Sequence, residues 1–142
     1  MSTALPAPPP EALALSAQLT GHIAGRIRAG GPLPLRDYLE AVLYAPGLGY
    51  YSAGSRKFGA EGDFVTAPEL GELYGRALAF ALAPVLDACE EPVLLELGGG
   101  SGALACTLLR TLAELDRLPR RYLMLDRSAD LRERQRARIY AQ

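Results

Sequence analysis

The sequence has few of the side chains that build metal sites and disulfide frameworks. Its 142 residues include two cysteines and one histidine. The histidine, His22, has no cysteine or carboxylate at a ligand spacing, so we predict no metal site. Cys89 and Cys106 lie in apolar stretches with helical periodicity, where a free thiol behaves as a small hydrophobic group. We therefore predict two unpaired, inert thiols.

A basic excess and a long apolar run are also missing. Lysine and arginine together number 15 against 16 aspartates and glutamates, for a formal net charge of -1. Proteins that bind nucleic acid or anionic membranes usually carry a basic excess, so neither partner is predicted. No stretch reaches the ~18 apolar residues of a membrane-spanning helix. Residues 1–10 lack the charged and apolar regions of a signal peptide, and we therefore expect a cytoplasmic protein.

The first two thirds of the chain have the sequence pattern of helices and loops. Residues 1–10 contain four prolines and are predicted to form a disordered tail. In the helical region predicted for residues 11–91, apolar residues recur at helical spacing over 11–29 and 35–44. Residues 46–62 hold five glycines interleaved with aromatic residues. A loop of this length inside a compact domain is typical of a functional segment.

A further helix is predicted to begin at Thr66. Thr66 and Glu69 have the spacing of a capping box, in which each side chain accepts a hydrogen bond from the other's backbone N–H. An apolar stripe with a 3.6-residue period follows. Pro84 is expected to kink or end this helix, because proline has no N–H to donate.

Residues 92–142 change to an alternating pattern of strands and helices. Short apolar runs, one of them bounded by proline and glycines, are typical of buried parallel strands. The predicted order is strand, glycine turn, helix, strand and helix, at residues 93–97, 98–102, 104–115, 122–125 and from Ser128 onward. Such a βαβα order predicts an α/β fold with a parallel sheet.

The glycine-rich turn after the first strand is the strongest functional signal in the chain. Residues 96–102 read Glu-Leu-Gly-Gly-Gly-Ser-Gly. A ligand that rests on a strand-to-helix turn needs backbone without side chains, and Gly98, Gly100 and Gly102 supply it. Asp126 ends the next strand, where a carboxylate can accept hydrogen bonds from both hydroxyls of a ribose. Together these features predict a nucleoside-containing ligand.

The glycine pattern alone does not name that ligand. Residues 98–103 also satisfy G-x-G-x-x-G/A, so a nicotinamide-dependent oxidoreductase is an alternative, and a non-catalytic interaction module is another. Glu96 weighs against a dinucleotide, because a carboxylate beside the ligand repels a pyrophosphate and suits an ammonium or sulfonium centre. S-adenosylmethionine has both cations and no phosphate. We therefore predict S-adenosylmethionine as the cofactor, bound by Glu96, Gly98, Gly100, Gly102 and Asp126.

Three stretches of the sequence resemble the motifs of a known family. ELGGGSG at residues 96–102 resembles the first motif of class I methyltransferases. LYAPGLGYY at 43–51 and FGAEGDFVTAPE at 58–69 resemble the L-Y-x-P-x-x-G-Y-Y and F-G-x-x-G-D-F-x-T-x-P-E signatures of the MidA-like family. The chain departs from the family at Asp126, where glutamate is frequent, and at Ala45, where histidine is common. An aspartate can still bridge a ribose.

The resemblance implies a fold, a cofactor and an activity. It implies an N-terminal helical segment followed by a Rossmann-like sheet that binds S-adenosylmethionine, with residues 92–142 as the start of that domain. The family includes a mitochondrial methyltransferase that dimethylates a protein arginine during assembly of respiratory complex I. Methyl transfer to the arginine side chain of a protein substrate is therefore the implied reaction. The groups that act on the acceptor typically follow the fourth strand, so no catalytic residue is assigned.

The signature loop before the predicted helix at Thr66 is a candidate part of the cofactor site. We expect this loop to fold over the cofactor, with Asp63 and Thr66 as polar contacts. Tyr50 and Tyr51 would then line the substrate entrance. The simpler interpretation is that Thr66 only caps a helix, Asp63 only supports a turn, and the tyrosines belong to the core.

The last part of the chain contains four alternating arginines and too few residues for a whole sheet. The arginines at 132, 134, 136 and 138 spread around the predicted helix, which favours a solvated or packing face over a nucleic-acid site. A seven-stranded sheet at ~30 residues per strand and helix needs roughly 200 residues. Only 50 run from Val93 to Gln142. We therefore predict an N-terminal fragment with an incomplete sheet, inactive alone.

Overall fold

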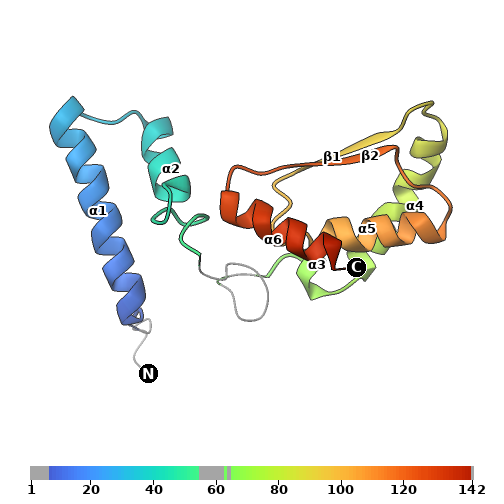
Figure 1. Ribbon diagram of the computed structural model, residues 1–142, viewed down its shortest axis with the longest axis horizontal. Coiled ribbons are helices and arrows are strands. Elements are labelled where there is room, and N and C mark those ends of the chain that lie inside the picture. Colours follow the sequence, from blue (N-terminus) through green and yellow to red (C-terminus); the bar gives the residue numbers. More distant parts are fainter. Residues whose placement is uncertain (1–6, 55–62, 64, 142) are drawn as a thin grey trace, which may run out of the picture. The chain divides into compact units, whose positions relative to one another are not determined.

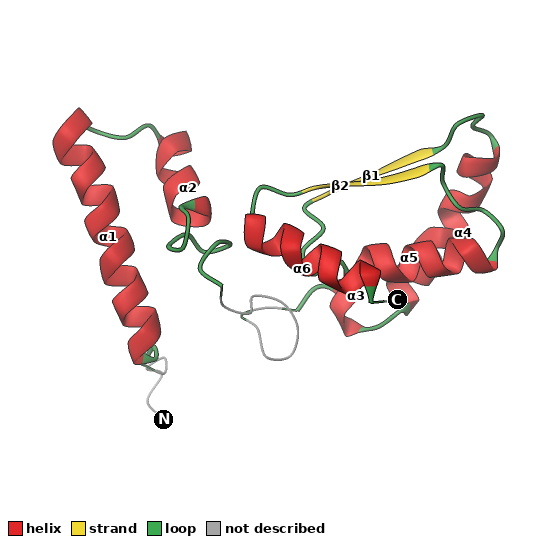
Figure 2. Cartoon of the chain, in the orientation of Figure 1, coloured by secondary structure: helices red, strands yellow, loops and turns green. Residues whose placement is uncertain are grey.

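The computed structural model describes residues 7–54, 63 and 65–141 (Figure 1). The chain divides into two compact units, Met1–Gly54 and Ser55–Gln142. The first unit contains helices and loops, and the second also contains the strands (Figure 2). Within the described residues, none of the helices combines the length and the apolar character that a bilayer crossing requires.

The first unit has two helices, which match the predicted ones closely. α1 spans Pro10–Gly30 and α2 spans Leu35–Tyr44. α1 begins at a proline because the first turn of a helix has no partner for that N–H in any case. It ends at Gly31, whose φ of 81° is in the left-handed region that favours glycine. A disordered tail was predicted for residues 1–10, and residues 1–6 of it lie outside the described ones.

The chain after α2 turns back onto that helix. Tyr50 and Tyr51 donate their backbone N–H groups to the carbonyls of Val42 and Leu43, each at 2.8 Å. Gly49 lies so close to α2 that a Cβ there would sit 2.5 Å from a backbone nitrogen of the helix end. The predicted loop is therefore an ordered turn in its first part, and its residues 55–62 lie outside the described ones.

The second unit contains the predicted strand and helix alternation. Its two strands are parallel, with Val93 beside Arg121 and Leu97 beside Leu125. The α/β fold class is confirmed, with the first βαβα unit of a Rossmann-like sheet. The elements are α3 (Ala67–Leu70), α4 (Leu73–Asp87), β1 (Val93–Leu97), α5 (Ala103–Glu114), β2 (Arg121–Leu125) and α6 (Ala129–Tyr140).

Two local predictions about the helix after Thr66 are wrong. The predicted single helix is interrupted at Gly71, with φ 154°, and so forms α3 and α4. Of the two effects expected at Pro84, a kink or an end, the end does not occur, because α4 continues through Pro84 to Asp87. The capping box is absent, because Thr66 makes no side-chain cap bond and the Glu69 carboxylate binds Ser101 instead. At α6 the prediction is confirmed: Ser128 Oγ accepts the N–H of Leu131 at 3.2 Å.

The core of the second unit lies between α4, α5 and one face of the sheet. Ala79, Leu86, Leu108 and Leu112 are buried together, and the strands contribute partly buried apolar side chains to them. α4 approaches α5 closely at Gly75, where a Cβ would lie 2.8 Å from Thr107 Cγ2. The predicted domain boundary between residues 91 and 92 stays a prediction, although α4 before it packs on α5 after it.

The other face of the sheet is open within the described residues. α5 and α6 lie on one side of the two strands (Figure 1). On the opposite side the exposed fractions reach 69% for Leu97 and 62% for Leu125. Parallel sheets normally have both faces covered, so the described part of the chain supplies one covering layer.

Replacement of Leu112 by alanine tests the position of this core. Leu112 is fully buried between α4 and the sheet, and we expect Leu112→Ala to lower the free energy of unfolding by about 2–5 kcal/mol. Urea denaturation followed by circular dichroism measures it. Leu118→Ala, at an exposed leucine, is the control and should change stability by less than about 0.5 kcal/mol. Equal losses in the two variants would contradict the assignment.

Candidate functional site

The glycine turn lies at the carboxyl end of β1, next to the end of β2. Gly98 donates its N–H to the carbonyl of Leu125 at 2.9 Å, which extends the strand pairing into the turn. Gly98, Gly100 and Gly102 have φ of 71°, 54° and 82°, and residues with a Cβ rarely adopt such values. The three glycines predicted to leave bare backbone are therefore the three that the turn requires for its conformation.

Gly99 has a packing role that the sequence pattern did not indicate. It is buried, and a Cβ on it would lie 2.3 Å from Met124 Cε. Met124 is on β2, on the side of the sheet that faces the helices. The middle one of the three consecutive glycines thus lets the turn approach the sheet, while its neighbours Gly98 and Gly100 provide positive φ angles.

A pocket of about 330 Å³ opens at this turn. Its walls come from residues 66–69 at the start of α3, Tyr74 on α4, residues 96–101 and the first turn of α5. Of the predicted site residues, it brings together Thr66, Glu96, Gly98 and Gly100. The N-terminus of α5 has no side-chain cap, so backbone N–H groups remain available at the pocket wall.

Glu96 is a half-buried carboxylate in the pocket wall. Its Oε2 accepts a hydrogen bond from the hydroxyl of Tyr122 at 2.8 Å. Burial raises the pKa of Glu96 above its ordinary value, the hydrogen bond from Tyr122 opposes this shift, and the charge of Asp126 adds to it. Burial, together with the bond to Glu96, also raises the pKa of Tyr122, so the hydroxyl stays a donor. In the described part of the chain, Glu96 has no ion-pair partner.

A second carboxylate in the pocket, Glu69, is paired. Its side chain is 14% exposed and accepts a hydrogen bond from the Ser101 hydroxyl. Arg138 Nη1 lies 3.8 Å from Glu69 Oε1 and donates to Ser101 Oγ at 2.6 Å. Arg138, which was predicted to belong to a solvated or packing face of α6, is partly exposed and reaches the glycine turn. Glu96 is therefore the carboxylate of the pocket whose charge lacks a cation.

Asp126 lies at the end of β2, outside the pocket wall. Its Oδ1 accepts the backbone N–H of Ser128 at 3.0 Å, and its Oδ2 accepts Nε2 of Gln135 at 3.0 Å. The same Gln135 nitrogen donates to the carbonyl of Gly100 at 3.0 Å. The predicted acid is thus linked to the glycine turn through a side chain on α6. Sequence reasoning missed Gln135, and its only signal was its place four residues after Leu131 on one helix face.

The signature loop lies only partly within the described residues. Asp63 is exposed and does not line the pocket, and residues 55–62 and 64 lie outside the described ones. Thr66 lines the pocket. Tyr50 and Tyr51 belong to the first unit, where their rings meet edge to face with centroids 4.9 Å apart.

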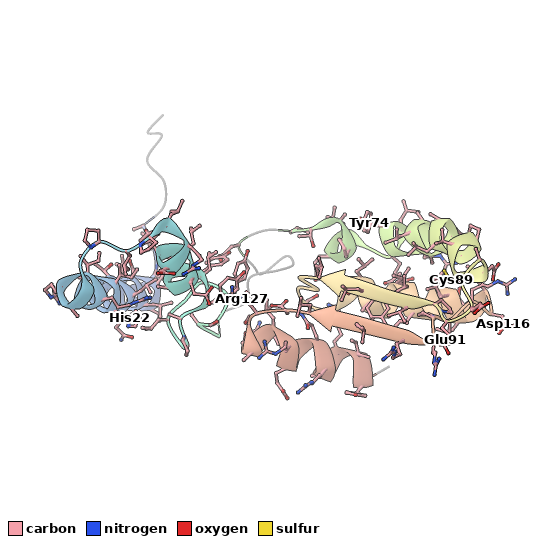
Figure 3. All side chains as sticks on the ribbon, turned by 90° about the horizontal axis from the view of Figure 1, so that it is seen from above. His22, Tyr74, Cys89, Glu91, Asp116 and Arg127 are labelled. Atoms are coloured by element: carbon pink, nitrogen blue, oxygen red, sulfur yellow. The ribbon has the colours of Figure 1, made fainter. Side chains whose placement is uncertain are left out.

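Within the part of the chain that the structure describes, we find no further cluster of titratable groups. Figure 3 shows Cys89, Glu91 and Asp116 at the end of the second unit where the strands begin, away from the glycine turn. Cys106 is buried, and burial raises the pKa of its thiol. No group of three or more histidine, cysteine, aspartate or glutamate side chains in residues 7–54, 63 and 65–141 has the arrangement of a metal site.

Comparison with known proteins gives similar sequences and a similar structure. A family model for S-adenosyl-L-methionine-dependent methyltransferases matches residues 77–142. The mitochondrial protein arginine methyltransferase NDUFAF7 of Danio rerio is 35% identical over 97 residues, which cover 66% of this chain and 23% of that protein. Its Drosophila melanogaster homologue is 35% identical over 112 residues, covering 74% and 25%.

A crystal structure from Burkholderia thailandensis with bound S-adenosyl-homocysteine superposes with a TM-score of 0.85 at 44% identity. The superposition covers 98% of this chain and 37% of that one. The chain spans about a quarter of the length of the curated relatives that it matches. Those relatives are mitochondrial proteins, which contradicts the cytoplasmic location expected from the sequence, so that prediction is wrong. The shared motifs, the matching family model and the superposed fold support the resemblance of this chain to the MidA-like family of class I S-adenosylmethionine-dependent methyltransferases.

Proposed function

We propose that the protein is a methyltransferase and that this chain supplies the S-adenosylmethionine-binding part of its site. The observation that carries the proposal is Glu96, a half-buried carboxylate without a cation beside a turn of left-handed glycines. A buried charge costs free energy unless a partner compensates it. The ammonium group of the methionine part of the cofactor supplies such a partner, whereas a pyrophosphate does the opposite.

The other predicted binding residues have complementary roles in this proposal. Gly98 and Gly100 leave space for the cofactor against bare backbone, and Gly102 allows α5 to begin directly after the turn. Asp126 accepts hydrogen bonds from the ribose hydroxyls, since each of its oxygens has one acceptor position beyond its internal bond. Thr66 contributes a hydroxyl to the same pocket. We keep Asp63 as a further polar contact.

The cofactor supplies the methyl group on a sulfonium centre, and the protein holds donor and acceptor in line while it excludes water. We propose a protein arginine side chain as the acceptor, because the matched curated relatives are protein arginine methyltransferases. Two carboxylates line the pocket, Glu69, which is paired with Arg138, and Glu96, whose uncompensated charge gives the pocket its negative character. We assign neither of them to removal of a proton from the acceptor.

A titration with two ligands tests the choice of cofactor. We expect S-adenosylhomocysteine to shift the amide resonances of Gly98 and Gly100 in ¹⁵N–¹H spectra of the 142-residue chain, because the ligand rests on this backbone. NAD should leave them in place at the same concentration, because Glu96 repels its pyrophosphate. Shifts with NAD alone would favour the oxidoreductase alternative. Shifts with neither ligand would reject the cofactor proposal.

Substitution of Glu96 tests its electrostatic role. A raised carboxyl pKa means that, between the ordinary and the raised value, the folded chain binds more protons than the unfolded chain. Stability therefore falls as pH rises through that window, and Glu96 costs stability above it. We expect Glu96→Gln to raise the free energy of unfolding at pH 7. The same substitution should lower the affinity for S-adenosylhomocysteine about 10- to 100-fold, because a charge-assisted hydrogen bond is lost.

Calorimetric titration between pH 5 and pH 8 measures the second effect. Affinity of the unsubstituted chain should decrease as pH falls through the pKa of Glu96, and that decrease should vanish in Glu96→Gln. Glu133→Gln, which alters an exposed glutamate of α6, is the matched control and should leave the affinity as it is. Equal affinities of Glu96→Gln and the unsubstituted chain would refute the role of this carboxylate.

A further inference from the structure

Gln135 is a buried amide between the glycine turn and the end of β2. Its side chain is on α6, and its residue exposure is 3%. Its Nε2 donates to the Gly100 carbonyl and to Asp126 Oδ2, each at 3.0 Å. Both partners are acceptors only, so chemistry requires the nitrogen and not the oxygen of the amide to face them. The two N–H groups of one amide therefore join two predicted parts of the cofactor site.

Two glycines of the turn lie next to Gln135. A Cβ on Gly102 would lie 3.4 Å from Gln135 Cα, and a Cβ on Gly99 would lie 3.4 Å from Gln135 Nε2. Leu131 and Gln135 are the residues of α6 classed as buried, and they lie one turn apart on the face that meets the glycine turn. The glycine turn is thus fitted to α6 as well as to a ligand.

A buried amide at such a position costs free energy unless it forms hydrogen bonds. An apolar side chain of similar length fills space without needing partners, whereas a buried amide needs hydrogen bonds. Gln135 finds them in the turn and in Asp126, and Ser128 N–H holds the other oxygen of the same carboxylate at 3.0 Å. Both oxygens of Asp126 are therefore held by internal donors, and each keeps one free acceptor position.

We propose that Gln135 is a positioning residue for ribose recognition. Its amide fixes the Asp126 carboxylate relative to the Gly100 backbone. The carboxylate that binds the sugar therefore stays at a constant distance from the backbone that binds the rest of the ligand. The inference rests on the proposed function, since it requires Asp126 to accept hydrogen bonds from a ribose. It goes further because it predicts that a residue of α6 contributes to the affinity for the ribose hydroxyls.

Two nucleosides that differ only in those hydroxyls test this role. In the 142-residue chain, adenosine should bind at least about tenfold more tightly than 2′,3′-dideoxyadenosine, as expected for hydrogen bonds to a charged group. In Gln135→Met, which keeps side-chain length but has no amide, this ratio should fall toward one, mainly through weaker adenosine binding. Gln18→Met, at an exposed glutamine of α1, should keep the full ratio. Amide chemical shifts followed by titration give both dissociation constants.

The outcomes separate this inference from the proposed function. A ratio near one in the unsubstituted chain overturns both, because Asp126 then does not read the ribose. A large ratio that persists in Gln135→Met, or a loss that is equal for the two nucleosides, overturns the role of Gln135 alone. If Gln135→Met does not fold, the side-chain amide resonances of Gln135 in the unsubstituted chain replace it. They should shift with adenosine and stay in place with the dideoxy analogue, and identical shifts overturn the inference.

Discussion

Two parallel strands of five residues each fix the geometry of the candidate site. The bond from Gly98 N–H to the Leu125 carbonyl carries their pairing beyond the last residues of the strands. Because parallel strands end at the same edge of a sheet, the glycine turn and Asp126 emerge side by side. The register sets Glu96 beside Met124, with Tyr122 two residues earlier on the same face. The hydrogen bonds of the candidate site all involve residues at this edge of the sheet.

Burial and charge act against each other at this edge. The core of α4 and α5 covers the face of the sheet from which Glu96 projects, and it removes water from one side of the carboxylate. The Tyr122 hydroxyl compensates part of that cost, but Arg138 pairs with Glu69 and not with Glu96. The pocket therefore combines one neutralised and one uncompensated carboxylate. In the proposed function, the uncompensated charge favours a cationic nucleoside over a dinucleotide, because it repels a pyrophosphate.

Neighbouring glycines of the turn meet different constraints. Positive φ angles explain Gly98, Gly100 and Gly102, and contact with Met124 explains Gly99. From the sequence motif alone, all of these glycines would be interpreted as ligand contacts. The packing of α6 shows that the space beside this turn is also occupied by protein, because the Gln135 side chain fills part of it. The fold therefore constrains this glycine-rich turn, and the proposed ligand adds a second constraint.

The sequence by itself determined the features that depend on near neighbours in the chain. Apolar periodicity, proline and glycine predicted the helices, the strand order and the turn, and Glu96 and Asp126 followed from their places beside strand ends. The tertiary structure alone decided the partners of Glu69, Tyr122, Gln135 and Arg138. Gln135 lies 35 residues from Gly100, and Ser101 lies 32 residues from Glu69. Such contacts depend on how helices pack on the sheet, for which a local sequence pattern has no signal.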